Sequence, residues 1–270
     1  MRELLIRTLS GAVLVAVIIG SILWSPWAWA AVALFVVTVG TYEMCKLQKI
    51  SMRPYLLIGE AVTLGAFVVA ALVALEVISM RWLLLELLFP MMPFLISLFS
   101  KQYDFKTISA YCFGSWAYLS LPASLMVFMV RQDLFGDLAG PRLLIMVFAL
   151  LWVNDTFAYL TGKLLGKHKL FERISPGKTI EGSLGGLVFT LVGVILLSQY
   201  VSWLPLKAAV GMGLIAVVFG TLGDLCESML KRQAGVKDSG SLIPGHGGIL
   251  DRFDSVLFSV PFVFVYLLLL

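Results

Sequence analysis

The residues most able to do chemistry lie in one polar stretch, residues 223–255, between two long apolar segments. Only 13% of the chain is charged, yet this stretch combines acids, bases, a histidine and a glycine-rich turn. Its charged side chains belong to Asp224, Glu227, Lys231, Arg232, Lys237, Asp238, Asp251, Arg252 and Asp254. Acids that bind a cation, beside bases that bind phosphate, predict a metal-dependent phosphoryl-transfer site.

The acids of this stretch include two pairs with helical spacing. Asp251 and Asp254 are three positions apart, as are Asp224 and Glu227, so each pair shares one helical face. Mg²⁺ prefers one or two carboxylates together with waters and substrate phosphates. We therefore predict a divalent-metal site with Asp224 and Asp251 as ligands and Asp254 as an additional or more distant ligand. The alternative is that these acids only cap the last helix and pair with Arg252.

A turn of sequence Pro244-Gly245-His246-Gly247-Gly248 directly precedes the last acid pair. Glycine permits positive φ and close approach of the backbone to a ligand. Successive free N–H groups in such a turn form a concavity that binds anions. We expect the turn to cradle a polyphosphate, while His246 either donates to a phosphate or only shapes the turn.

Basic residues gather in this stretch and in a second polar loop. They are Lys231, Arg232 and Lys237 here, and Lys167, Lys169, Arg173 and Lys178 in the loop at 161–186. We expect several of them to neutralise a polyphosphate and an anionic lipid head group. The alternative is that they are simply the positive residues that cytoplasmic loops of membrane proteins retain.

The elements that must position these residues are apolar and long. The chain is 60% hydrophobic with a mean hydropathy of +0.98, whereas a soluble domain carries about 25% charged residues. Apolar runs in lipid must be helical, because their backbone has no other hydrogen-bonding partner there. We predict an all-α, polytopic integral membrane protein with about nine transmembrane helices. The expected spans are residues 4–24, 27–45, 55–79, 82–99, 108–130, 142–162, 182–202, 206–226 and 250–270.

The distribution of Lys and Arg predicts the orientation. With the N-terminus in the cytoplasm and the C-terminus outside, all of the 20 Lys and Arg residues except Arg81, Arg131, Arg142 and Lys207 fall on the inner side. This bias is the one that the positive-inside rule describes. Asp155, Asp224, Asp251 and Asp254 then meet at the cytoplasmic face. We expect an N-terminal region of five spans, residues 1–130, and a catalytic region of four spans, residues 131–270, with cytoplasmic loops at 161–181 and 227–249.

Several other classes of protein are disfavoured. The net charge of +4 is explained by topology, so we expect no nucleic-acid partner. Cys45, Cys112 and Cys226 have no spacing typical of disulfides or zinc sites. The N-terminal apolar run resembles a signal peptide, but we interpret it as an uncleaved first span.

Glu43, Glu60 and Glu86 lie within or at the ends of apolar runs, with Glu60 inside the third span.

The polar stretch resembles a known family signature. Ser228-Met-Leu-Lys231-Arg232, then Lys237-Asp238-Ser239-Gly240, then the run from Pro244 through Asp251-Arg252-Phe253-Asp254-Ser255 is similar to the signature of the phosphatidate cytidylyltransferases, or CDP-diacylglycerol synthases. Weaker similarity covers Asp155 to Lys167 and Ser175 to Gly182, where Gly177 replaces a residue that is usually basic or polar. The specific resemblance covers residues 154–255, and the first five spans resemble the family only in hydropathy.

The resemblance implies an activity and roles for residues. The substrates would be CTP and phosphatidic acid, with Mg²⁺ as cofactor, a second, monovalent cation left open, and a homodimer suggested. The enzyme would lie in the cell membrane, the inner or plasma membrane, as a multi-pass protein whose site faces the cytoplasm. Catalytic roles fall to Asp224, Lys231, Arg232, Asp251 and Asp254. Substrate binding falls to Lys167, Lys178, Thr179, Ser228, Lys237, Asp238, Gly245, His246, Gly247, Gly248 and Arg252.

Two alternative functions remain open at this point. A CTP-dependent kinase of a polyprenol-type alcohol would also place acids beside a membrane, but would transfer the γ-phosphoryl group of CTP. An ion-coupled transporter would suit intramembrane acids. However, the two halves of the sequence do not form the internal repeat typical of such transporters, and the acids gather at one face of the membrane.

Overall fold

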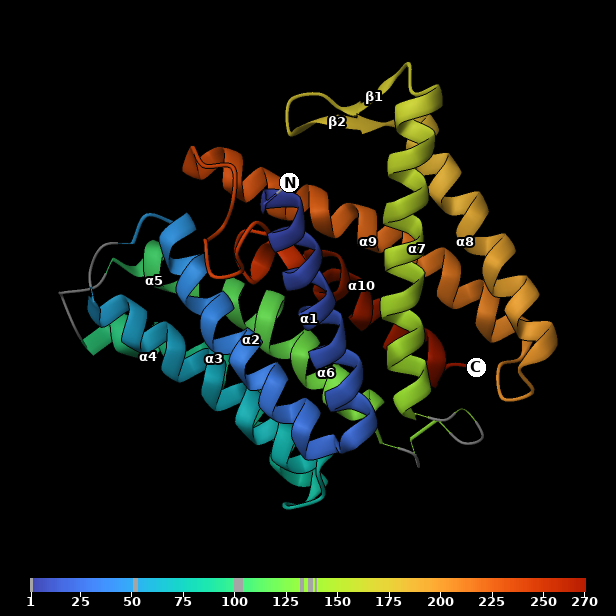
Figure 1. Ribbon diagram of the computed structural model, residues 1–270. Helices are drawn as coiled ribbons and strands as arrows, with labels where there is room; N and C mark the ends of the chain where they lie inside the picture. Colours follow the sequence, from blue (N-terminus) through green and yellow to red (C-terminus); the bar gives the residue numbers. More distant parts are fainter. Residues whose placement is uncertain (1, 51–52, 100–103, 132–133, 136–137, 139) are drawn as a thin grey trace. The chain divides into compact units, whose positions relative to one another are not determined.

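The computed structural model describes residues 2–50, 53–99, 104–131, 134–135, 138 and 140–270, and it is almost wholly helical (Figure 1). Eight helical segments in these residues are long and apolar enough to cross a membrane. They are Leu5–Trp24, Pro26–Leu47, Arg53–Ala74, Met80–Phe99, Phe105–Met129, Gly140–Leu165, Ile180–Tyr200 and Leu206–Ala234. The prediction of an all-α, polytopic membrane protein is therefore confirmed.

In the first part of the chain, the described residues form six α-helices with shorter helical turns between them. In order they are α1 (Arg2–Trp24), α2 (Pro26–Leu47), α3 (Arg53–Ala74), the 3₁₀ helices η1 (Met80–Leu87) and η2 (Phe89–Met91), α4 (Met92–Phe99), α5 (Phe105–Ser115), the π-helical turn η3 (Trp116–Ser120) and α6 (Leu121–Met129). Local chemistry sets the boundaries. Ser25 caps α2 by accepting a hydrogen bond from the backbone N–H of Ala28 at 3.1 Å. The third helix ends at Ala74, before the expected residue 79, and Glu76 just beyond it has a positive φ of 61°.

The described residues of the second part form four helices and a small hairpin. They are α7 (Gly140–Leu165), β1 (Lys169–Phe171), β2 (Ser175–Thr179), α8 (Ile180–Tyr200), α9 (Leu206–Ala234) and α10 (Leu250–Leu268). The antiparallel β1–β2 hairpin pairs Lys169 with Thr179 and departs from the all-α expectation. It forms in the polar segment between two apolar helices, where the backbone is not confined to a helix by lipid.

The expected ninth span corresponds to α10, but this helix carries Asp251, Arg252 and Asp254 in its first five residues. It is not among the eight described segments whose length and composition suit a membrane crossing. The count of nine spans and the N-in, C-out orientation therefore stay predictions.

The chain divides into two compact units. The first unit contains residues 1–131 and 233–252. Its core includes the fully buried Trp29, Phe67 and Tyr111. The Tyr111 hydroxyl donates to the carbonyl of Thr41 at 3.1 Å and so joins α5 to α2. At Gly59 of α3 a Cβ would collide with the Tyr111 ring, so this glycine allows the close packing of α3 and α5.

The second unit contains residues 132–232 and 253–270. Helices α7 and α8 lie side by side (Figure 1), and small residues allow their close approach. A Cβ at Gly186 would collide with the side chain of Asn154, which is buried. The ring pairs Phe157–Phe189 and Phe219–Phe262 are stacked, with centroids 4.2 Å and 3.6 Å apart.

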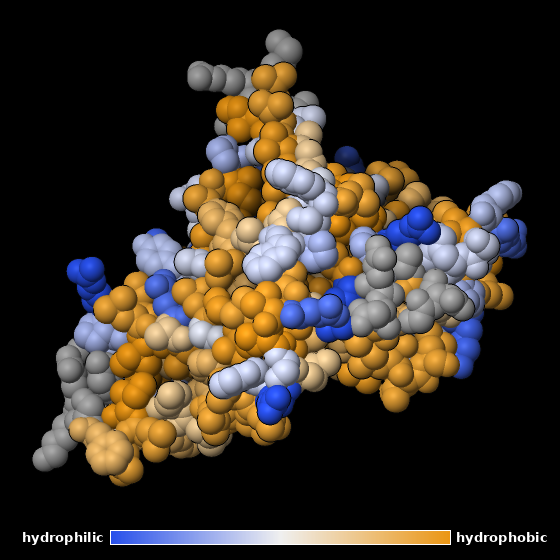
Figure 2. Space-filling model, turned by 90° about the horizontal axis from the view of Figure 1, so that it is seen from below, coloured by the Kyte–Doolittle hydropathy of each residue, from blue (hydrophilic) through white to orange (hydrophobic). Residues whose placement is uncertain are grey.

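The surface is largely apolar, as expected for a protein that faces lipid. Figure 2 shows one face on which hydrophobic residues cover most of the described area. On α8, Leu184, Val188, Val192 and Leu196 are exposed at four-residue intervals, which places them along one side of the helix. Such a stripe suits contact with acyl chains.

Candidate functional site

In the second unit, Asp224 lies near the cytoplasmic end predicted for α9 and is paired with a lysine from the hairpin. The Nζ of Lys178, in β2, lies 2.6 Å from the Oδ2 of Asp224, and both side chains are partly exposed. The hydroxyl of Ser228, one turn later on α9, donates to the Oδ1 of Asp224 at 3.2 Å. The structure thus brings together three residues that the sequence placed in the site, and the hairpin explains how Lys178 reaches Asp224.

Asp254 of α10 adds a second carboxylate to this cluster. It is half-buried and interacts electrostatically with Asp224, Asp155 and Lys231. Its Oδ1 accepts a hydrogen bond from the backbone N–H of Ser255 at 2.7 Å. Three carboxylates and one lysine therefore share one electrostatic environment in this unit.

Gly223 permits this proximity of Asp224 and Asp254. A Cβ at position 223 would lie 2.5 Å from the Cβ of Phe258 and 2.7 Å from the carbonyl oxygen of Asp254. Real Cβ atoms do not approach other heavy atoms so closely, so only glycine fits between the backbones of α9 and α10 here. The close contact of the two helices places the adjacent Asp224 near Asp254.

The remaining charged residues of α9 are engaged within the protein. Glu227 is fully buried and forms an ion pair with Lys231, four positions later. The Nε of Arg232 donates to the carbonyl of Ile174 at 3.2 Å. Lys231 thus lies at the predicted site with a partner that balances its charge, and Arg232 fastens the hairpin turn to α9.

The hairpin is held at its base by Glu181. This carboxylate accepts hydrogen bonds from the backbone N–H groups of Lys167 at 3.0 Å and His168 at 3.2 Å, and it lies 2.6 Å from the Nδ1 of His168. Thr179, predicted to bind substrate, is buried, and its hydroxyl caps α8 by accepting from the backbone N–H of Gly182 at 3.1 Å. These contacts fix the strand that carries Lys178, while the side chain of Lys167 is exposed.

In the first unit, Asp251 organises the glycine turn. Its Oδ2 accepts hydrogen bonds from the backbone N–H groups of Gly248 at 2.7 Å and Ser239 at 2.9 Å, and it lies 3.0 Å from the hydroxyl of Ser239. Gly245 and Gly247 have positive φ angles of 74° and 85°, a conformation that glycine adopts readily. The backbone N–H of Gly248 therefore already donates to Asp251. The part of the expected phosphate cradle that remains is the turn around Gly245 and Gly247.

His246 is directed toward α1 in this structure. Its Nδ1 lies 2.8 Å from the hydroxyl of Ser10, and that hydroxyl also donates to the carbonyl of Pro244 at 3.0 Å. Its backbone N–H donates to the carbonyl of Ile243 at 2.9 Å. These contacts fit the alternative in which His246 shapes the turn, and both roles of His246 stay predictions. Lys237, Asp238 and Arg252 are exposed in the same unit.

Sequence reasoning missed the role of Glu43. This residue of α2 is 3% exposed and accepts hydrogen bonds from the backbone N–H groups of Ile249 and Leu250 and from the hydroxyl of Ser239, at 3.0, 2.9 and 2.9 Å. The available signal was an acid near the end of an apolar span. No short-range pattern connects it to a segment about 200 positions later in the sequence.

The donor set suits a magnesium ion. No group of three or more His, Cys, Asp or Glu side chains in the described residues is arranged to hold a metal by itself. Mg²⁺ needs fewer, because water and substrate phosphates complete its shell. Asp224 and Asp254 offer oxygen ligands in one electrostatic environment, and Asp251 stands one turn before Asp254 on α10. Asp224 and Asp251 belong to different units, so their sharing of one ion stays a prediction.

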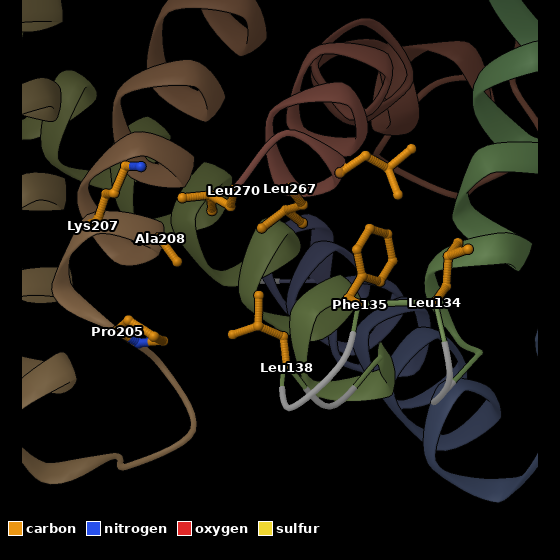
Figure 3. Close-up of a pocket in the computed structure, with 9 residues that line it drawn as sticks. Leu134, Phe135, Leu138, Pro205, Lys207, Ala208, Leu267 and Leu270 are labelled. Carbon is orange, nitrogen blue, oxygen red and sulfur yellow. The ribbon is translucent and has the colours of Figure 1, made fainter.

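A cavity of about 520 Å³ lies elsewhere in the second unit (Figure 3). Its lining is apolar apart from Lys207 and includes Phe135, Ala208 and Leu267. Lys207 and Asp224 lie on the same helix, α9, and are separated by a helical length of roughly 25 Å. This cavity is therefore remote from the acidic cluster and does not belong to the predicted site.

Fold and site together define an integral membrane protein with an acid–lysine cluster suited to phosphate chemistry. The chain matches the model of the cytidylyltransferase family over residues 5–270 and belongs to this family. Three similar proteins are all named phosphatidate cytidylyltransferase. Those of Staphylococcus haemolyticus (strain JCSC1435) and Staphylococcus aureus (strain COL) are 42% identical over 165 and 161 residues, and that of Staphylococcus saprophyticus is 40% identical over 161 residues. The similarity spans 59% of this chain and 59% of the length of each relative.

Proposed function

We propose that this protein transfers the cytidylyl group of CTP to phosphatidic acid, giving CDP-diacylglycerol and pyrophosphate. The observation that carries the proposal is the cluster of Lys178, Asp224 and Asp254, where Lys178 forms an ion pair with Asp224 and Asp254 interacts electrostatically with Asp224. Membership of the cytidylyltransferase family supports nucleotidyl transfer. The names of the staphylococcal relatives support phosphatidic acid as the acceptor.

The reaction needs charge neutralisation more than it needs a base. A phosphate oxygen of phosphatidic acid bonds to the α-phosphorus of CTP, and the bond from that phosphorus to the bridging oxygen of the β-phosphate breaks. Pyrophosphate leaves with the electron pair. Because the attacking phosphate is already an anion, no strong general base is required. The obstacle is bringing two anions together, which fixed cations overcome.

The acids of the site hold the cofactor in this proposal. Asp224 and Asp254 would bind Mg²⁺, with Asp251 as the third carboxylate predicted from the sequence. When bound, Mg²⁺ supplies charge neutralisation for the polyphosphate. Whether a monovalent cation binds beside Mg²⁺ is left open by the resemblance.

The bases of the site bind the phosphates. Lys178 forms an ion pair with Asp224, and in this proposal its ammonium also binds a phosphate oxygen of CTP. Lys231 remains beside Glu227, so its net contribution is smaller than that of a lysine without a carboxylate partner. The family resemblance assigns further phosphate contacts to Lys237, Arg252 and the turn at Gly245 and Gly247, which belong to the first unit.

The protein would work in the cell membrane, with its site open to the cytoplasm, where CTP is present. The positive-inside distribution of Lys and Arg supports this orientation. A homodimer stays a prediction.

Product analysis tests the proposal. The purified protein is incubated in detergent with phosphatidic acid and with CTP labelled at either the α- or the γ-phosphate. Label entering lipid only from the α-position, with release of one pyrophosphate per lipid, is the expected result. Label entering lipid from the γ-position would show a kinase instead, and ion flux in vesicles without CTP would show a transporter.

A further inference from the structure

The loop that joins α9 to α10, residues 235–249, is hydrogen-bonded to Glu43, a residue of α2. The carboxylate of Glu43 accepts hydrogen bonds from the backbone N–H groups of Ile249 and Leu250, where α10 begins. A carboxylate is favoured there because the N-terminus of a helix carries partial positive charge and N–H groups that lack an intrahelical partner. Glu43 therefore caps α10 in place of a local capping residue.

Glu43 also reaches Asp251 through one shared hydroxyl. The Oγ of Ser239 lies 2.9 Å from the Oε2 of Glu43 and 3.0 Å from the Oδ2 of Asp251. A serine hydroxyl has a single proton, so it donates to one carboxylate at a time. The backbone N–H of Ser239 donates to Asp251 in either case. Ser239 therefore lies between the two acids, and its hydroxyl links the position of the Asp251 carboxylate to that of the Glu43 carboxylate.

Two glycines make room for this arrangement. A Cβ at Gly240 or at Gly248 would collide with the carboxylate of Glu43. Neither residue has a positive φ that would otherwise call for glycine. The glycines at 240 and 248 thus fit the buried carboxylate.

We propose that Glu43 is a positioning residue for Asp251. It caps α10 and, through Ser239, fixes the rotamer of Asp251 and the position of its carboxylate at the start of α10. The effect on catalysis rests on the proposed function, whereas the effect on the loop does not. Glu43 touches neither substrate nor metal in this account.

The chemistry requires a glutamate at this position. The substitution Glu43→Gln would retain the size of the side chain, but the new NH₂ group would face backbone N–H donors, which cannot accept its hydrogen bonds. The substitution Glu43→Asp would shorten the side chain by one methylene, so that it would not reach both amides of α10. Both substitutions should therefore loosen the loop, while the helical core of the unit stays folded.

Hydrogen–deuterium exchange tests the positioning without substrate or metal. The full-length protein in detergent is compared with Glu43→Gln and with Glu60→Gln, a matched control at a half-buried glutamate of α3. Exchange in peptides covering 239–250 should become at least tenfold faster in Glu43→Gln and stay unchanged in Glu60→Gln. Equal protection of this segment in wild type and Glu43→Gln would overturn the proposal.

Kinetics then separate this proposal from the proposed function. Glu43→Gln should lower kcat at least tenfold and raise the Mg²⁺ concentration for half-maximal activity, with the KM for CTP changed less than threefold. Ser239→Ala should show the same pattern more weakly, and it serves as the test if Glu43→Gln does not fold. Faster exchange with undiminished kcat would overturn the catalytic part. An inactive wild type with faster exchange in Glu43→Gln would leave the loop role intact and remove the proposed function.

Discussion

The ammonium of Lys178 lies 2.6 Å from a carboxylate oxygen of Asp224, so a strand of a small hairpin and a long apolar helix meet at one ion pair. Both side chains are partly exposed, at 27% and 31%. In water such a pair adds little to stability. It does hold a lysine beside the acids, where the proposed polyphosphate substrate would need a cation.

Replacing Lys178 tests this relationship. Lys178→Ala should lower the rate of cytidylyl transfer by about 10²-fold, comparable to the loss of one charge-stabilising donor in other enzymes. Lys178→Arg should retain part of the activity, because the charge is kept while the geometry changes. Lys169→Ala is the matched control, since its Nζ is bound to the carbonyl of Pro176 on the same hairpin. Equal rates for Lys178→Ala and Lys169→Ala would contradict the assignment.

Gly223 allows a prediction about helix contact. Gly223→Ala should force α9 and α10 apart, because its Cβ would lie 2.5 Å from that of Phe258. Overpacking of this kind costs about 1–3 kcal/mol, so the apparent melting temperature in detergent should fall and the transfer rate with it.

Gly193→Ala in α8 is the control, because apart from the adjacent residues and the nearby backbone of α8 itself no atom lies within 4 Å of the added Cβ. Its melting temperature should stay the same or rise slightly, as helix propensity favours alanine. A Gly223→Ala variant as stable and active as Gly193→Ala would show that the close contact at Gly223 is unimportant.

The orientation of the C-terminus can be measured with a reporter. Nine spans and a cytoplasmic N-terminus place the C-terminus outside, so alkaline phosphatase fused after Leu270 should be active in intact bacterial cells. The same reporter inserted after Ser241, in the loop before α10, should be inactive. An active reporter in the loop would contradict the predicted orientation or the count of nine spans. An inactive C-terminal fusion that is expressed normally would do the same.

The positions of the helices were largely predictable from sequence. Lipid leaves the backbone of an apolar run no alternative to a helix, and eight expected spans coincide with helices that suit a membrane. The ion pair of Glu227 and Lys231 was also within reach, since residues four apart meet on a helix. The end of α3 at Ala74 was missed because Leu75, Val77 and Ile78 continue the apolar run on both sides of Glu76, so hydropathy alone gives no stop signal.

The contacts that shape the site were less predictable. The hairpin of residues 169–179 places Lys178 against Asp224, but its strands are short and follow no alternating pattern. Glu43 caps a helix whose sequence lies about 200 positions away, and only a tertiary fold can bring the two together. The resemblance in residues 154–255 therefore pointed to the cytidylyltransferase family, to which the chain belongs, but it could not reveal the role of the early helices.

The most direct test of the account is the transfer of α-labelled cytidylyl from CTP to phosphatidic acid by wild type, Asp224→Asn and Asp104→Asn. Asp104 caps α5, and asparagine is also a good capping residue, so this variant should be as active as wild type. Asp224→Asn should be at least 10²-fold slower in the same preparation. A rate for Asp224→Asn within threefold of wild type would contradict the central claim that this aspartate is at the centre of the reaction.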